Sequence, residues 1–127
     1  MAVPVPGPLK VDSLLVELPR ADQLVMTGSV ANPAIQAQLA RYLESVHAHV
    51  ADKRLSAFAV DVKGLTFVNS SAIRVFVDWI SRAQGAGYKL VFHVDRSITW
   101  HRLSFSVLKS LAPSHVEVTE ASATGAA

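Results

Sequence analysis

The sequence contains no cysteine among its 127 residues. This absence excludes disulfide bonds, thiol catalysis and zinc sites with cysteine ligands, and it is typical of proteins from reducing compartments. Charged residues are also scarce, with 12 Lys and Arg against 10 Asp and Glu, and the basic residues are scattered along the chain. A nucleic-acid-binding surface needs basic residues clustered on one face, so nucleic acid is not an expected partner.

Long hydrophobic runs are absent as well. A membrane-spanning helix needs roughly 20 consecutive apolar residues, whereas the apolar runs here, such as Ala57–Val60, are far shorter. The first ten residues, MAVPVPGPLK, contain three prolines and no extended apolar segment, which is unlike a signal peptide. We therefore expect a soluble, cytoplasmic protein without membrane insertion.

The sequence does have enough apolar residues to build one core. Half of its residues are hydrophobic and only 17% are charged, as in a folded domain rather than a disordered chain. Prolines crowd the start of the chain, and small polar residues end it. We expect a flexible Pro-rich lead-in over residues 1–9, a single domain over residues 10–119 and a disordered tail over residues 120–127.

Hydrophobic periodicity predicts eight elements in the order β β α β α β α β. Asn32 and Pro33 suit the N-cap and the first position of the first helix, which should end near Asp52. The second helix should follow Ser71 and be stopped by Gly85 and Gly87, and the third should cover Ser97–Ala112, capped by Asp95 or Ser97. The strands are expected at Val11–Leu18, Gln23–Thr27, Phe58–Val62, Tyr88–Val94 and His115–Thr119.

This order indicates an α/β fold with an N-terminal hairpin and a mainly parallel sheet, because helices alternate with strands after the first two strands. The apolar run Phe58–Val62 is typical of a central strand that is buried on both faces. Lys63–Ser71 is expected to form a loop that leads into the second helix.

A more specific pattern lies within Val60–Arg74, where Asn69-Ser70-Ser71-Ala72 precede the expected second helix. This segment resembles the central signature of STAS domains, the fold of anti-sigma-factor antagonists, in which Asp-Ser-Ser-Gly occupies the four positions. The likeness continues through Arg82–Val91 and covers residues 11–118. It implies a STAS-like single domain that acts as a small binding switch in bacterial signal transduction and transcription regulation, and not as an enzyme.

The resemblance also implies a partner and a modification. An anti-sigma-type serine kinase would phosphorylate Ser70, with Ser71 as the alternative site, and the unphosphorylated form would bind its partner. A serine at a helix N-terminus is exposed and close to unpaired N–H groups, which stabilise a phosphate there. The phosphate adds about −1.5 to −2 charge, which can release a docked partner. Ordinary helix capping explains Asn69, Ser70 and Ser71 equally well.

A second hypothesis is a non-phosphorylated STAS scaffold or accessory subunit of a larger complex, either stressosome-like or lipid-transporting. Asn69 and Ala72 stand where the family has Asp and Gly, and Ala31 stands where switch members often carry another Asp. An amide at position 69 can cap a helix but cannot act as a carboxylate.

Two helices offer candidate partner-binding residues in addition to Asn69 and Ser71. On the second helix, Arg74, Val75 and Trp79 form an edge, and Trp79 is interpreted either as a core residue or as an interface anchor. The third helix has one more apolar stripe than packing on a sheet requires. The lead-in covers the second stripe, or a partner or a second copy in a homodimer binds it. The two stripes are Ile98, His101, Phe105, Leu108 and Ala112, and Trp100, Leu103, Val107 and Leu111.

No residue set supports catalysis, a metal or a cofactor. His47 and His49 are not four residues apart, so they cannot form a two-histidine metal face, and structural roles are expected for all five histidines. The sequence has no Gly-x-Ser-x-Gly elbow, no Walker-type loop and no dinucleotide-binding glycine pattern. We therefore expect no enzyme activity and no bound cofactor.

Overall fold

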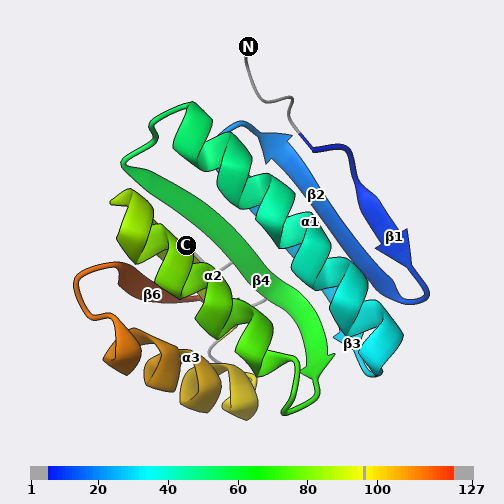
Figure 1. Ribbon diagram of the computed structural model, residues 1–127. Coiled ribbons are helices and arrows are strands. Elements are labelled where there is room, and N and C mark those ends of the chain that lie inside the picture. The colour runs from blue at the N-terminus through cyan, green and yellow to red at the C-terminus, as the bar shows by residue number, and fades with distance from the viewer. Residues whose placement is uncertain (1–5, 96, 122–127) are drawn as a thin grey trace.

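The computed structural model describes residues 6–95 and 97–121, and this part of the chain forms six strands and three helices (Figure 1). The predicted lead-in and tail fall partly on residues 1–5 and 122–127, which lie outside the described residues. The strands are β1 (Leu9–Val11), β2 (Leu14–Arg20), β3 (Gln23–Val30), β4 (Ala57–Val68), β5 (Lys89–Asp95) and β6 (Val116–Ala121). The helices are α1 (Pro33–Asp52), α2 (Ile73–Ala86) and α3 (Thr99–Leu111).

The strands form one sheet in the order of the sequence, β1-β2-β3-β4-β5-β6. The first three strands are antiparallel, and β3, β4, β5 and β6 are parallel. This architecture confirms the predicted α/β fold with an N-terminal hairpin. The single strand expected at Val11–Leu18 is wrong in detail, because Asp12 adopts the left-handed backbone conformation (φ 52°) and a turn separates β1 from β2.

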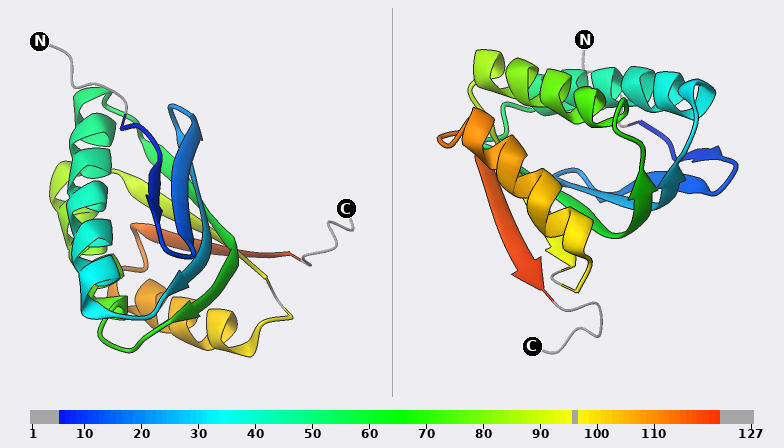
Figure 2. Two further views of the ribbon diagram at one scale, coloured as in Figure 1. Left: turned by 90° about the vertical axis from the view of Figure 1, so that its right-hand side faces the viewer. Right: turned by 90° about the horizontal axis from the view of Figure 1, so that it is seen from below.

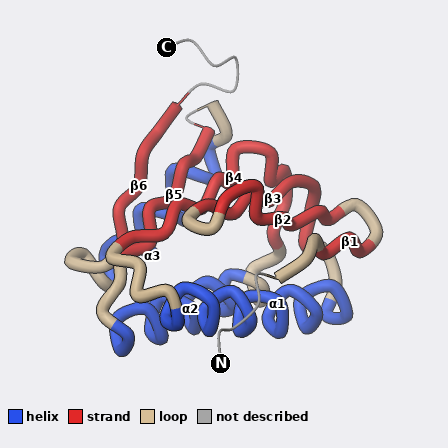
Figure 3. The backbone as a smooth tube through the Cα atoms, turned by 90° about the horizontal axis from the view of Figure 1, so that it is seen from above, coloured by secondary structure: helices blue, strands red, loops and turns tan. Residues whose placement is uncertain are grey.

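All three helices lie on one face of the sheet (Figures 2 and 3). The connections β3–α1–β4, β4–α2–β5 and β5–α3–β6 each advance by one strand in the same direction. Because such connections are right-handed, each places its helix on the same face. The ring of Phe92 on β5 accordingly contacts both Phe76 of α2 and Phe105 of α3, with centroids 6.1 and 5.0 Å apart.

The expectation that Phe58–Val62 is buried on both faces is therefore wrong. Phe58, Val60 and Val62 point toward the helices and are fully buried, whereas Ala59 and Asp61 are partly exposed on the opposite face. Among the described residues, no helix covers that face.

The loop expected at Lys63–Ser71 is also shorter than expected, because β4 continues to Val68. The extension pairs with β3 through two register shifts, and the Thr66 hydroxyl donates a hydrogen bond to the Gly28 carbonyl (2.9 Å). Pairing with a neighbouring strand satisfies the backbone of Lys63–Val68, although the residues in this segment do not alternate in burial as the first part of the strand does.

Local chemistry sets the start of the first helix as predicted. Asn32 is the N-cap of α1, its side-chain oxygen accepts a hydrogen bond from the Ile35 N–H (2.9 Å), and Pro33 is the first helical residue. The cap predicted for the third helix is wrong, because the N-cap of α3 is Ile98 and no side chain caps the helix. The Asp95 carboxylate instead accepts hydrogen bonds from the N–H and hydroxyl of Ser97 (2.9 and 2.7 Å), which form a turn before α3 begins at Thr99.

Two buried histidines join elements that are distant in the sequence. His101 donates a hydrogen bond through Nε2 to the Leu65 carbonyl (2.6 Å), and its Nδ1 accepts one from the Asp95 N–H (3.2 Å). This ring therefore ties α3 to the ends of β4 and β5. Nε2 of His49 is 2.9 Å from the Ala21 carbonyl oxygen and ties α1 to the hairpin turn. In the part of the chain that is described, no helix is long and apolar enough to cross a membrane.

We predict that Gly28→Ala strongly destabilises the domain. Gly28 has a φ of +99°, and an added Cβ would overlap the carbonyl oxygen of Ser13. The loss should exceed about 1–3 kcal/mol, because the strained backbone and the overlap act together. Urea unfolding measures it. Gly85→Ala is the matched control: no atom lies within 4 Å of its added Cβ, so this helical substitution should stabilise by up to about 1 kcal/mol. Equal midpoints for the two variants would contradict this account of Gly28.

Candidate partner-binding surface

The turn between β4 and α2 consists of Asn69–Ala72 and is held by Asn69. The Asn69 side-chain oxygen accepts a hydrogen bond from the Ala72 N–H (2.8 Å), and the Asn69 N–H donates to the Val30 carbonyl (3.0 Å). The turn is thus attached both to the start of α2 and to the end of β3.

The side chain of Ser70 does not help to hold this turn. Its side chain is exposed, and its hydroxyl forms no hydrogen bond within the described ranges. Ser71 is exposed as well and contributes only its carbonyl oxygen, which accepts a hydrogen bond from the Gln36 side chain of α1 (3.3 Å). None of the three polar residues expected to cap α2 is its N-cap, which is Ala72 and has no side-chain hydrogen bond to the helix. Asn69 instead caps the turn that precedes α2, through its bond to the Ala72 N–H. Helix capping therefore does not explain the hydroxyl at position 70.

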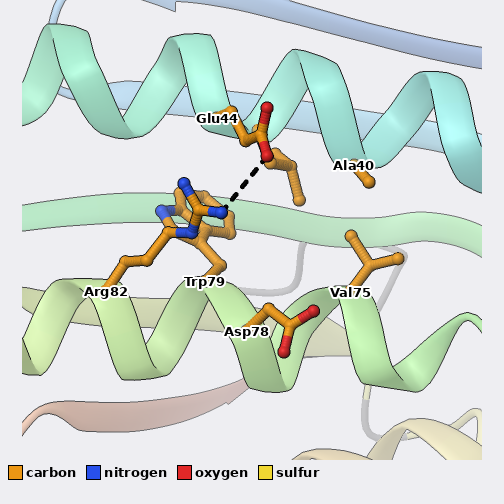
Figure 4. A pocket seen from close by; sticks show the side chains of 7 residues that line it. Ala40, Glu44, Val75, Asp78, Trp79 and Arg82 are labelled. Atoms are coloured by element: carbon orange, nitrogen blue, oxygen red, sulfur yellow. Dashed lines mark hydrogen bonds and ion pairs between the residues drawn. The ribbon is translucent and has the colours of Figure 1, made fainter.

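A seam between α1 and α2 starts beside this turn and contains a small pocket (Figure 4). Glu44 and Arg82 reach toward each other across it and form an ion pair of 3.2 Å, and both side chains are about half-exposed. Such an exposed pair contributes at most about 1 kcal/mol. The pocket is lined by Ala40, Leu43 and Glu44 of α1 and by Val75, Asp78, Trp79 and Arg82 of α2.

Two candidate partner-binding residues in this seam are core residues. Trp79 is 2% exposed and Val75 is 7% exposed. The Trp79 indole packs edge-on against Phe58, with centroids 6.0 Å apart. In this structure Trp79 is therefore inaccessible as an interface anchor, because α1 covers the edge of α2 that carries it. Arg74, by contrast, is exposed in the first turn of α2, close to Ser70.

Trp79 also belongs to a chain of hydrogen bonds with Tyr88 and His47. The Trp79 indole N–H donates to the Tyr88 hydroxyl oxygen (3.0 Å), which lies 2.7 Å from Nδ1 of His47. Because an indole N–H can only donate, the Tyr88 hydroxyl has its own proton available for His47 Nδ1. That bond requires neutral His47.

The surroundings of His47 and Tyr88 shift the pKa values of both side chains. Burial lowers the pKa of His47 below its ordinary value, and the nearby Arg82 guanidinium lowers it further. Burial raises the pKa of Tyr88 to about 12, although the Trp79 hydrogen bond and Arg82 oppose this effect. Both shifts favour the neutral pair at physiological pH. Sequence reasoning did not single out His47 or Tyr88 as partners, because 41 positions separate them.

The other candidate partner-binding residues lie on α3. Its first apolar stripe is buried, including Phe105 and Leu108, except for Ile98, which is partly exposed. In the second stripe, Trp100 is half-buried and its indole N–H donates to the Thr66 carbonyl (3.1 Å). The remaining residues of this stripe are exposed: Leu103 by 66%, Val107 by 60% and Leu111 by 56%.

The lead-in does not explain the second stripe as far as it is described. Pro6–Leu9 lie against Tyr42, Ser45 and Ala48 of α1, on a different helix. Residues 1–5, on which the rest of that interpretation falls, lie outside the described residues. The two groups of candidates thus form separate surfaces, one around Asn69, Ser70, Ser71 and Arg74, and one along α3.

No group of three or more His, Asp or Glu side chains in residues 6–95 and 97–121 is arranged to hold a metal ion. The exposed hydroxyl of Ser70 has no acid–base pair in hydrogen-bond contact with it among these residues. The geometry around Ser70 is that of a surface turn.

No family model matches the sequence, and no curated protein matches it. Among solved structures, the chain resembles SiaC of Pseudomonas aeruginosa, in a crystal structure of the diguanylate cyclase SiaD in complex with its activator SiaC. The TM-score is 0.63 at 15% sequence identity, over 90% of this chain and 98% of that chain. At this identity the likeness shows the fold alone, and it agrees with the predicted α/β topology.

We predict that Asn69→Ala lowers the free energy of unfolding by about 0.5–2 kcal/mol, the usual effect of losing a cap. Ser70→Ala should change it by less than about 0.5 kcal/mol, because its hydroxyl bonds to no described residue. Urea unfolding of the two variants under the same conditions makes the comparison. A larger loss for Ser70→Ala than for Asn69→Ala would show that Ser70 holds the turn.

We also predict an acid-sensitive contribution of His47 to stability. The folded state lowers the pKa of His47, so the unfolded chain, with a pKa of about 6.5, binds the proton more tightly. The contribution is complete above pH 6.5 and is lost as the pH falls toward the lower pKa of the folded state. Subtracting the pH profile of His47→Gln from that of the original protein isolates it. An NMR titration midpoint of His47 at or above 6.5 would contradict the assignment.

Proposed function

We propose that the protein is a cytoplasmic regulatory module of the anti-sigma-antagonist type, which binds a protein partner and is switched by phosphorylation of Ser70. The observation that carries this proposal is the division of roles in the β4–α2 turn. Asn69 holds the turn, while the Ser70 hydroxyl is exposed and has no hydrogen bond to any described residue. A kinase can therefore modify Ser70 without breaking a bond that stabilises the fold.

The position of Ser70 gives a phosphate two local effects. The start of α2 carries the positive end of the helix dipole, which stabilises an anion there. Arg74 is exposed one turn into α2 and forms no ion pair with the described residues, so it is available to a phosphate. The added charge of about −1.5 to −2 changes the surface without requiring the domain to unfold.

The fold likeness to SiaC supports a protein partner, because that protein is the activator of an enzyme with which it forms a complex. We propose by analogy that this chain also acts by binding and not by catalysis. The partner that modifies it would be a serine kinase of the anti-sigma type.

A scaffold or accessory subunit that is never phosphorylated is the second candidate. Asn69 favours it, since its amide is used as a cap and supplies no carboxylate to the turn. The exposed apolar residues of α3 favour it too, because they offer a binding surface that does not involve Ser70.

The deciding experiment maps phosphopeptides of the protein isolated from its own cells with phosphatases inhibited. We expect phosphate on Ser70. Ser70→Asp should weaken binding to the co-purifying partner at least tenfold, while Ser70→Ala retains it. Ser45→Asp, at an exposed serine of α1 on the side away from α2 and α3, is the charge-matched control and should leave binding unchanged.

Phosphate on Ser71 alone would move the switch by one residue and overturn the assignment to Ser70. Absence of phosphate under several growth conditions, together with a stable complex that is indifferent to Ser70→Ala and Ser70→Asp, would favour the scaffold.

A further inference from the structure

The outer side of β6 is an unpaired edge of the sheet. β6 is the last strand in the sheet order, and among the described residues no strand pairs with its outer side (Figure 3). Its inner side pairs in parallel with β5, where the Leu90 N–H donates to the His115 carbonyl (2.8 Å). Alternate residues of a strand direct their backbone groups to the same neighbour. Val116, Val118 and Glu120 therefore direct theirs away from β5.

The backbone groups on this edge indicate what kind of segment binds it. The Val116 N–H already donates to the Ala112 carbonyl (2.9 Å). The Val116 carbonyl and both backbone groups of Val118 and Glu120 have no hydrogen-bond partner in the part of the chain that is described. A row of donors and acceptors at this spacing is matched by another extended chain, whereas a helix uses its backbone groups internally. The edge is therefore suited to a strand.

The flank of α3 beside this edge carries the charges. Arg102 forms an ion pair with Glu120 (3.3 Å). Lys109 lies on the same flank about 10 Å further along α3, because seven residues make two helical turns. Since α3 runs antiparallel to β6, Lys109 is level with the start of the strand. It lines a groove together with Val118 and has no ion pair among the described residues. A carboxylate thus lies at one end of the edge and a free ammonium at the other.

The sequence of β6 allows it to pair with a second copy of itself. When Val118 lies opposite Val118 of an antiparallel second copy, Val116 lies opposite Glu120, and the outward backbone groups of both strands meet. On the open face of the sheet, Glu117 then lies opposite Thr119. A pair centred on residue 117 would place two Glu117 carboxylates opposite each other, which is destabilising. A pair centred on residue 119 would leave Val116 outside it.

The pair centred on Val118 also brings opposite charges together. Glu120 lies between Arg102 of its own chain and Lys109 of the second copy, and the two-fold symmetry repeats this contact. Each α3 contacts both β5 and β6, so the two α3 helices would lie two strand spacings apart, at about 10 Å. Helices pack at this distance. Ser106, which is small and exposed, is nearest to the symmetry axis on each helix.

We propose that the protein forms a two-fold symmetric dimer in which β6 pairs antiparallel with β6 of a second copy, so that two sheets become one. Such a contact closes after two copies, whereas pairing β6 with the three-residue strand β1 of another copy would continue into a filament. The chain itself supplies the charge that Lys109 lacks, which favours a second copy over a foreign strand. The inference goes beyond the proposed function and does not depend on phosphorylation of Ser70.

Disulfide trapping tests the register directly, because the chain contains no cysteine. In a mixture of Glu117→Cys and Thr119→Cys chains, the two thiols lie opposite each other in mixed dimers, and mild oxidation should link them. Each variant alone is the control, since identical positions lie about 8 Å apart in this register, which is too far for a disulfide. Failure of the mixture to form covalent dimers, or equal yields from Thr119→Cys alone, would overturn the proposal.

Sedimentation equilibrium of the full chain measures the association. The original protein should be dimeric at concentrations up to about 100 μM, which would populate even a weak dimer. Val118→Pro removes the central N–H of both strands and should weaken the dimer at least tenfold. This N–H points away from β5, so the fold should be retained. Val118→Thr keeps the N–H and is the matched control. A monomer at every concentration, or equal dissociation constants for the two variants, would overturn the proposal.

Glu120→Gln tests the charge contact without altering the backbone. It leaves Arg102 of one copy beside Lys109 of the other and should weaken the dimer at least tenfold. Glu44→Gln is the matched control, because it also loses an exposed ion pair with an arginine but lies between α1 and α2. Equal dissociation constants for these variants would overturn the register. A benzophenone amino acid at position 119 that crosslinks in cells only to a different protein would show a foreign strand at the edge and overturn the dimer.

Discussion

The right-handed crossover is the constraint on which the rest of this structure depends. Three successive crossovers advance in one direction through β3, β4, β5 and β6, so α1, α2 and α3 share one face of the sheet. The aromatic rings of Phe76, Phe92 and Phe105 meet between α2, β5 and α3 because of this arrangement. The same constraint leaves the opposite face without a helical cover in the described chain, and it brings the turns that follow the parallel strands to one edge of the sheet.

At that edge, a structural role and the proposed regulatory role fall on adjacent residues. Asn69 bonds to Ala72 and to Val30 and holds the turn, whereas Ser70 projects from it with no bond to a described residue. A modifiable residue on a rigid turn can change the charge of a surface while the fold stays intact. The exposed apolar residues of α3, Leu103, Val107 and Leu111, are different in kind, since they form a surface that does not involve Ser70.

Local chemistry explains which parts of the fold could be predicted. Asn32 and Pro33 marked the start of α1 because an N-cap acts within a few residues of itself. The length of β4 could not be predicted in this way, since Lys63–Val68 form a strand only when β3 lies alongside to accept and donate their hydrogen bonds. The burial of Trp79 depended on α1, and the pairing of His47 with Tyr88 joined positions 41 residues apart. Residue spacing predicted the second stripe of α3, but only the structure showed that most of it is exposed.

The sequence by itself determined the class and order of the elements, the cap of α1, the position of Ser70 before α2 and the doubled apolar pattern of α3. These features depend on spacing and on side-chain chemistry over a few residues. Tertiary structure decided that one face of the sheet stays uncovered, that Asn69 and not Ser70 caps the turn, that Trp79 is inaccessible and that Leu103, Val107 and Leu111 meet water. Each of these outcomes depends on which distant segment packs against the residue, because burial and hydrogen-bond satisfaction are properties of the neighbours that folding supplies.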